Sequence, residues 1–371
     1  MQRTVSIKLT TTPEQSEALS VLASEFARGC NLAMGHASEK RCTNRVQLHH
    51  LAYYPVREKT RLGSQMACNV MRAVVGAYKT LKANKRLPLE GPLPEVVFGD
   101  RGAVHFDKRT YSIQGDTLSL YTLDGRIRAP MALGGFQREY LERGTPKEAK
   151  LVQKNKGWFF NLVLDVPAEA PRAGGVLGVD SGENNIAATS TGKVFGGGKL
   201  RYDRDRFLAL RGRLQRNGSQ SAKQLLKRVS GRERRHVTQV NHEVSKAIIA
   251  EALACGAGVI ALEKLTHIRK RIQAGKRLRS RLHRWAWAQL QVMIAYKAEA
   301  AGLRVVYVNP AYSSQTCAAC GQLASRNKHT LSCTCGNRAH ADVNAASNLA
   351  RLGETAVSSR DAVNRPDVGV A

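Results

Sequence analysis

The sequence predicts a multidomain α+β chain, in which an N-terminal β-barrel interrupted by a helical region precedes an α/β domain with a cysteine-rich insertion. Three observations support this fold class. Short alternating runs typical of strands dominate residues 95–168, apolar residues recur near helical spacing between residues 13 and 81, and strand and helix patterns alternate after residue 175. The 371 residues, 43% of them hydrophobic, are enough for about two or three domains with substantial cores.

The N-terminal elements follow from capping and periodicity. Residues 1–10 alternate as a strand does, and Thr12-Pro13 offers a helix cap followed by proline in the first turn. A second helix is expected from about Ser64 to Leu81, before a Pro/Gly-rich stretch. We therefore assign residues 1–10 and 91–170 to a β-barrel domain and residues 11–90 to an inserted helical domain.

The C-terminal half begins after a Pro/Gly-rich linker. We assign residues 171–312 and 341–353 to an α/β domain, residues 313–340 to an inserted cysteine-rich segment, and residues 354–371, which lack periodicity, to a disordered tail. Strands are expected at 176–180, 186–190, 193–195, 259–263 and 304–309, and helices at about 203–216, 220–255, 284–301 and 342–352.

Three carboxylates stand out in this half. Asp180 and Glu263 each end an apolar run of strand type, and Asp342 opens an Ala-rich helical stretch. A first-strand acid, a fourth-strand acid and an acid on a late helix form the order of a ribonuclease-H-like domain. Carboxylates gathered at one sheet edge require a divalent cation, and their hard oxygens suit Mg²⁺ or Mn²⁺. Separately, Asp180 could be a turn residue, Glu263 a solvated strand end and Asp342 a helix cap.

Four of the eight cysteines form two pairs, each followed by glycine: Cys317 with Cys320, and Cys333 with Cys335. This pattern predicts one structural Zn²⁺ held by four thiolates. The second pair has a single intervening residue where two are usual, so His329 or His340 could replace one thiolate. The remaining cysteines are scattered singly and are expected to be inert thiols.

The charge indicates the class of partner. The chain has 58 Lys and Arg against 29 Asp and Glu, a formal net charge of +29. We find no basic amphipathic helix and no long apolar span, which argues against a membrane partner and favours nucleic acid. The start of the chain reads as a strand and not as a signal peptide, so a cytoplasmic location is expected, with nucleoid association in a prokaryote.

Two basic stretches are candidate nucleic-acid contacts. One spans residues 201–235, and the other follows Glu263 without any acid. A lone run of this kind is usually a solvated loop, but directly after Glu263 it favours phosphate binding. The candidates in the second run are Arg269, Lys270, Arg271, Lys276, Arg277, Arg279, Arg281 and Arg284. Trp285 and Trp287 could stack on bases or simply pack, and Arg326 or Arg338, near the cysteine-rich segment, could contact a phosphate.

Four segments together resemble TnpB, the transposon-encoded ancestor of the type V CRISPR effectors. They are Gly178-Val-Asp-Ser-Gly182 with the following Asn-Asn-Ile-Ala, Ile260-Ala-Leu-Glu-Lys-Leu265, Ser313 to Gly321, and Asp342-Val-Asn-Ala-Ala-Ser-Asn348. They cover the C-terminal half in the family's order, while the N-terminal half fits the family's wedge and recognition domains more loosely. Two departures are Ser181, where a larger apolar residue is common, and the shortened second cysteine pair.

This resemblance implies an RNA-guided DNA endonuclease with a RuvC domain split around a zinc ribbon. Asp180, Glu263 and Asp342 would be the Mg²⁺-binding catalytic acids, and the partners would be a guide RNA and a double-stranded DNA target flanked by a short motif. Two alternatives remain: an RNA-guided DNA-binding repressor without cleavage, and an unguided zinc-ribbon DNA-binding protein or junction resolvase. The sequence leaves the oligomeric state, the guide and the motif open.

Overall fold

The computed structural model describes residues 1–155, 157–265 and 286–358. The chain divides near Pro167 into two compact units, each with its own core. The division falls at the start of the predicted linker. In the part of the chain that the structure describes, no helix is both long and apolar enough to cross a lipid bilayer.

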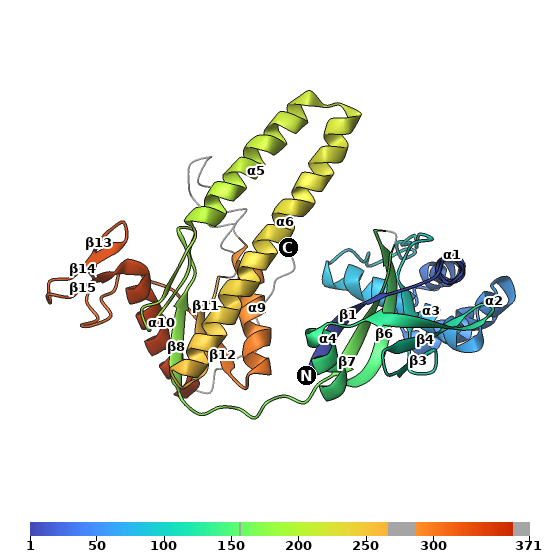
Figure 1. The fold of residues 1–371 in the computed structure, drawn as a ribbon, viewed down its shortest axis with the longest axis horizontal. Coiled ribbons are helices and arrows are strands. Elements are labelled where there is room, and N and C mark those ends of the chain that lie inside the picture. The colour runs from blue at the N-terminus through green and yellow to red at the C-terminus, as the bar shows by residue number, and fades with distance from the viewer. Residues whose placement is uncertain (156, 266–285, 359–371) are drawn as a thin grey trace. The chain divides into compact units, whose positions relative to one another are not determined.

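The first unit is built on one antiparallel sheet that curls into a nearly closed barrel (Figure 1). Its strand order is β2-β6-β7-β1-β5-β4-β3, so the first strand pairs with β7 and β5 as the inserted-helix prediction requires. The strands are β1 (Gln2–Leu9), β2 (Val104–Phe106), β3 (Tyr111–Gln114), β4 (Thr117–Thr122), β5 (Gly125–Ala132), β6 (Thr145–Lys154) and β7 (Gly157–Asp165).

Three helices between β1 and β2 cover this sheet: α1 (Pro13–Glu39), α2 (Arg45–Lys59) and α3 (Ser64–Ala83). Thr12 and Gln15 form the capping box of α1, with Pro13 in its first turn. Buried residues of the helices and of β7, among them Phe26, Tyr78 and Trp158, share one hydrophobic core. A short helix, α4 (Gly135–Arg143), precedes β6 and was not expected from the sequence.

The second unit contains a five-stranded sheet in the order β10-β9-β8-β11-β12. Its strands are β8 (Gly175–Asp180), β9 (Asn185–Thr189), β10 (Val194–Gly196), β11 (Ala257–Glu263) and β12 (Arg304–Val308), close to the predicted ranges. Strands β8, β11 and β12 are parallel, while β9 and β10 are antiparallel to their neighbours. The carboxyl ends of β8 and β11 therefore meet at one edge of the sheet.

Helices cover both faces of this sheet (Figure 1). Leu177 and Ile260 belong to a core shared with α6 (Gln220–Ala254) and α9 (Trp287–Ala300), whereas Val259 and Ala261 pack on the opposite face with Leu349 of α10 (Ala341–Ser358). Helix α5 (Gly198–Asn217), which precedes α6 in the chain, begins five residues before its predicted start and forms a long hairpin with α6. Helix α10 continues to Ser358, so the predicted disordered tail is wrong for residues 354–358.

The cysteine-rich segment forms a small three-stranded antiparallel sheet of β13 (Ser325–Asn327), β14 (Thr330–Ser332) and β15 (Arg338–His340). β15 leads directly into α10. The segment and the helix that carries Asp342 are therefore continuous.

Candidate active site and metal centres

The sheet brings Asp180 and Glu263 together. Leu262 of β11 pairs with Val179 of β8 in parallel register, so the two acids that follow end neighbouring strands at the same level. Side chains alternate along a strand, and both acids fall on the face covered by α10. Their carboxyl groups are close enough to share a hydrogen bond when one of them is protonated.

Asp342 completes the group from the first turn of α10 and is only 8% exposed. Its Oδ2 accepts a hydrogen bond from Asn185 Nδ2 at 2.8 Å, and its Oδ1 accepts one from Arg326 Nη2 at 2.8 Å. Asn185 begins β9 and Arg326 lies on β13, so two elements fix the orientation of this carboxylate.

The electrostatics of the three acids fit a cation site. Burial raises the pKa of Glu263 to about 10, and the hydrogen bond and charge of Asp180 add to the rise. Burial also raises the pKa of Asp180, with a further contribution from the charge of Asp342. A divalent ion would remove this penalty because carboxylate oxygens are the ligands that Mg²⁺ and Mn²⁺ prefer. The donor set therefore fits the expected metal.

Two contacts hold the backbone beneath the acids. A Cβ atom at Gly178 would lie 1.9 Å from the carbonyl oxygen of Ala346, so only glycine on β8 lets α10 approach this closely. Gln291 of α9, which is 4% exposed, donates from Nε2 to the carbonyl oxygen of Glu263 at 2.9 Å. The first contact places Asp342 over the sheet, and the second fixes the end of β11.

The four paired cysteines form a second cluster, with Sγ atoms all within 4.8 Å of one another. Cys317 and Cys335 are 3.8 Å apart at sulfur, and Cys320 and Cys333 are 3.5 Å apart. Tetrahedral Zn–S bonds of about 2.3 Å imply a sulfur separation of about 3.8 Å, so four thiolates fit one Zn²⁺. The hydrogen bond from Asn337 Nδ2 lowers the pKa of Cys317 to about 6, which favours the thiolate.

Two asparagines on α10 tie this cluster to the helix of Asp342. Asn344 accepts from the Ala318 backbone N–H at 2.8 Å and donates to the Thr316 carbonyl at 2.7 Å. Asn348, one turn later, donates to the same carbonyl at 2.7 Å. The amide side chains therefore bind the loop that carries Cys317.

His329 and His340, the alternative zinc ligands, do not lie in the cysteine cluster. They gather instead beside Asp342, and the potential ligand atoms of the three residues lie within 4.8 Å of one another. Their rings are stacked with centroids 5.7 Å apart. The structure thus separates the histidines from the thiolates.

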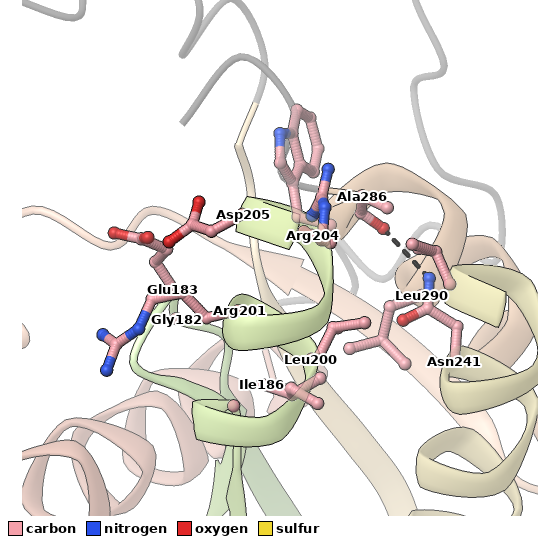
Figure 2. A pocket seen from close by; sticks show the side chains of 13 residues that line it. Gly182, Glu183, Ile186, Leu200, Arg201, Arg204, Asp205, Asn241, Ala286 and Leu290 are labelled. Atoms are coloured by element: carbon pink, nitrogen blue, oxygen red, sulfur yellow. Dashed lines mark hydrogen bonds between the residues drawn. The ribbon is translucent and has the colours of Figure 1, made fainter. Parts of the chain in front are cut away.

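A small hollow lies against the loop that follows Asp180 (Figure 2). Glu183, Arg201 and Asp205 lie at its rim, while Ile186 and Leu200 line its base. It encloses only about 40 Å³, room for a few water molecules and not for a nucleotide. None of the three acids lines this hollow.

The α5–α6 hairpin carries the first basic stretch. Glu233 is one of its few acids and pairs with Arg204 and Arg211 at 3.9 and 3.3 Å. The surplus of arginine and lysine suits a polyanion. The second run, Arg269, Lys270, Arg271, Lys276, Arg277, Arg279, Arg281 and Arg284, lies outside the described residues, as does Trp285.

With this geometry in hand, comparison with known proteins gives a consistent result. Residues 287–349 match the family model described as Cas12f1-like, TNB domain. The chain is 34% identical over 184 residues to the TnpB-like protein MJ0751 of Methanocaldococcus jannaschii, an alignment covering 48% of this chain and 65% of that protein. The predicted resemblance to TnpB is confirmed.

Further similarity is to Cas12f proteins. The chain is 41% identical over 114 residues to the CRISPR-associated endodeoxyribonuclease Cas12f1 of Sulfoacidibacillus thermotolerans, covering 30% of this chain and 26% of that one. The chain thus spans less than two thirds of the length of these relatives. The structure of a Cas12f1–sgRNA–target DNA complex shares the fold, with a TM-score of 0.62 at 15% identity over 92% of this chain and 83% of that one.

Proposed function

We propose that the chain is an RNA-guided DNA endonuclease whose RuvC-like centre consists of Asp180, Glu263 and Asp342. The observation that carries this proposal is the convergence of the three acids from β8, β11 and α10 at one sheet edge. The strand order β10-β9-β8-β11-β12, in which only β9 runs antiparallel to the other four strands, supports a ribonuclease-H-like domain.

The residues around the acids suit metal-dependent phosphodiester hydrolysis. When bound, two Mg²⁺ or Mn²⁺ ions supply an activated water and stabilise the leaving oxygen. Asp180 and Asp342 would hold these ions, and Glu263 would complete the coordination and orient the attacking water. Asn185 and Arg326 keep the Asp342 carboxylate aimed at the site. Arg326, which donates to Asp342 at 2.8 Å, would also contact the scissile phosphate.

Delegation of sequence recognition to a guide RNA accounts for the charge of the chain. A net charge of +29 supplies backbone contacts for a guide RNA and a DNA target, without requiring base-reading side chains for the whole target. The names of the relatives support this assignment, since they include an endodeoxyribonuclease and a complex with a single guide RNA and target DNA. The zinc ribbon would have a structural role, because four thiolates leave no open position for water. Such a complex would act in a prokaryotic cytoplasm.

A groove in the first unit is the candidate for contact with the flanking DNA motif. It has a volume of about 810 Å³ and lies between α2, α3 and the barrel. Its lining includes several cations, among them Arg45, Lys108 and Lys147. We propose that the duplex beside the target lies in this groove, with these cations on its phosphates.

The proposal is tested by isosteric replacement of the acids. The full chain is expressed with the DNA that flanks its gene, co-purifying RNA is sequenced, and matching DNA targets with randomised flanks are cleaved in Mg²⁺. Asp180→Asn, Glu263→Gln and Asp342→Asn should each reduce cleavage to background while RNA and target binding persist. Chelation of Mg²⁺ should have the same effect.

Glu243→Gln is the matched control, because Glu243 is an exposed acid on α6 bonded only to Gln239 among the contacts described, at 2.8 Å. It should cleave as the wild type does. Cleavage by Asp180→Asn at the wild-type rate would overturn the assignment of the centre. Purification without any RNA would instead favour an unguided DNA-binding protein.

A further inference from the structure

The most distinctive unassigned cluster is the pair of histidines beside Asp342. His329 lies in the turn between β13 and β14, and His340 is the last residue of β15. Thr330 pairs with His340 across the ribbon, and the Ala341 N–H donates to the His329 carbonyl at 2.8 Å. The backbone of the ribbon therefore holds both imidazoles against the first turn of α10.

We propose that His329, His340 and Asp342 form a second transition-metal site, separate from the cysteine cluster. Three potential ligand atoms within 4.8 Å of one another can close on one ion with modest side-chain rotation. Two imidazoles and one carboxylate suit Zn²⁺, Co²⁺, Ni²⁺ or Mn²⁺, whereas Mg²⁺ prefers oxygen ligands alone. Three protein ligands leave further coordination positions to water.

The existing hydrogen bonds leave room for such an ion. Each oxygen of Asp342 accepts one hydrogen bond, from Asn185 or Arg326, and retains a second lone pair. His340 Nδ1 accepts from the Asp342 backbone N–H at 3.3 Å, a long bond that a metal bond would replace. The ring of His329 is exposed and reaches the ion from solvent.

Occupation of this site would change the chemistry at the sheet edge, a consequence that rests on the proposed function. Asp342 is shared between the histidine site and the three acids, so a Zn²⁺ ion on the histidines competes with Mg²⁺ for the same carboxylate. Zn²⁺ added beyond the structural equivalent should therefore inhibit Mg²⁺-dependent cleavage. Binding of the second ion itself does not depend on any nuclease activity.

The test measures metal content and cleavage separately. The full chain is equilibrated with micromolar free Zn²⁺, and the bound zinc is counted. The wild type should hold two Zn²⁺ per chain, and His329→Ala/His340→Ala should hold one. His36→Ala/His50→Ala, which removes two imidazoles from α1 and α2, should still hold two. One Zn²⁺ in the wild type, or two in the His329/His340 variant, would overturn the site.

Cobalt substitution shows whether the ribbon of each variant is folded. Co²⁺ on four thiolates gives an intense near-ultraviolet charge-transfer band, while Co²⁺ on imidazole and carboxylate gives only weak visible bands. The double variant should keep the charge-transfer band and lose the weak ones. If it loses both, the single variant His329→Ala replaces it, since that ring is exposed. The single variant should weaken binding of the second ion on the order of 10-fold or more.

Inhibition is then read in the cleavage assay. Excess Zn²⁺ should inhibit the wild type and leave His329→Ala resistant. Equal inhibition of both would refute the competition for Asp342. If the wild type holds two Zn²⁺ but never cleaves DNA in Mg²⁺, the metal site stands and the proposed nuclease function fails, so the two failures are distinguishable.

Discussion

Replacement of Glu263 by Gln should stabilise the protein in the absence of Mg²⁺, although it removes a proposed catalytic group. Without a bound cation, the Glu263 carboxyl is buried beside Asp180, and its raised pKa keeps it protonated at neutral pH. Gln has nearly the same shape and donates an N–H to Asp180 without binding a proton. The variant therefore keeps the hydrogen bond and removes the cost of neutralising the carboxyl.

The size of the effect follows from the pKa of Glu263. The carboxyl ionises near pH 4.5 in the unfolded chain, but its pKa in the folded, metal-free site is about 10. Between these values the folded state binds more protons than the unfolded state, so stability falls as pH rises. Each pH unit costs about 1.4 kcal/mol, which gives a penalty of up to about 4 kcal/mol near pH 7.5. Below about pH 4.5 the penalty disappears.

The assay is urea unfolding of the full chain from pH 5 to pH 8, without Mg²⁺ and with tightly bound zinc retained. Glu263→Gln should be the more stable protein near pH 7.5 and should show a flatter dependence on pH. Its melting temperature should rise about 2–4 °C for each kcal/mol gained in a unit of this size. Mg²⁺ should stabilise the wild type more than the variant, since the variant lacks one ligand.

Glu243→Gln controls for the loss of an acid, and its free energy of unfolding should stay within about 0.5 kcal/mol of the wild-type value at every pH. A Glu263→Gln protein that is less stable than the wild type at pH 7.5, or that keeps the wild-type slope with pH, would refute the burial argument.

Three further predictions concern the framework and the groove. Cys320→Ser should lose the tightly bound zinc and lower the melting temperature of the second unit. The control Cys255→Ser, at the exposed end of α6, should keep the zinc and the wild-type melting temperature. Zinc retained by Cys320→Ser in elemental analysis would contradict the four-thiolate site. Gly178→Ala should lower the free energy of unfolding in urea by about 1–3 kcal/mol, because its Cβ would meet the Ala346 carbonyl. Gly175→Ala is the control, since its Cβ would meet no atom within 4 Å. Equal stability of the two variants would count against the close approach of α10. The double variant Arg45→Gln/Lys108→Gln should weaken DNA binding and reduce the slope of log K against log salt concentration by up to about 1.8. Arg126→Gln, on β5, is the control. An unchanged salt slope would exclude DNA binding in the groove.

Much of the fold was predictable because hydrophobic periodicity dominates its central elements. The strands that end at Asp180 and Glu263 were expected from continuous apolar runs, which are typical of buried parallel strands. Some short elements were not expected, among them α4 and the three-residue strands of the cysteine-rich segment. Such elements carry too few residues for a periodic signal, and their partners lie elsewhere in the chain.

The three acids of the candidate site could be predicted from the sequence, but the residues that hold them in position could not. The sequence placed Asp180, Glu263 and Asp342 at element ends, and the parallel register brings the first two into contact. Asn185 and Gln291 gave no comparable signal, since a polar residue at a strand start or within a helix is commonly solvent exposed. Only the tertiary fold turns them toward Asp342 and the Glu263 backbone. The separation of the histidines from the thiolates likewise depends on how β14 and β15 pair.

The asparagines of α10 make the cysteine cluster and the first turn of that helix one cooperative unit. Asn344 and Asn348 hold the loop of Cys317, while Arg326 reaches back from β13 to Asp342. Part of the free energy of binding an ion at the four cysteines would therefore hold a carboxylate that this ion does not contact. Local opening of the cysteine-rich segment would therefore also displace Asp342, so the order of this carboxylate depends on the order of that segment.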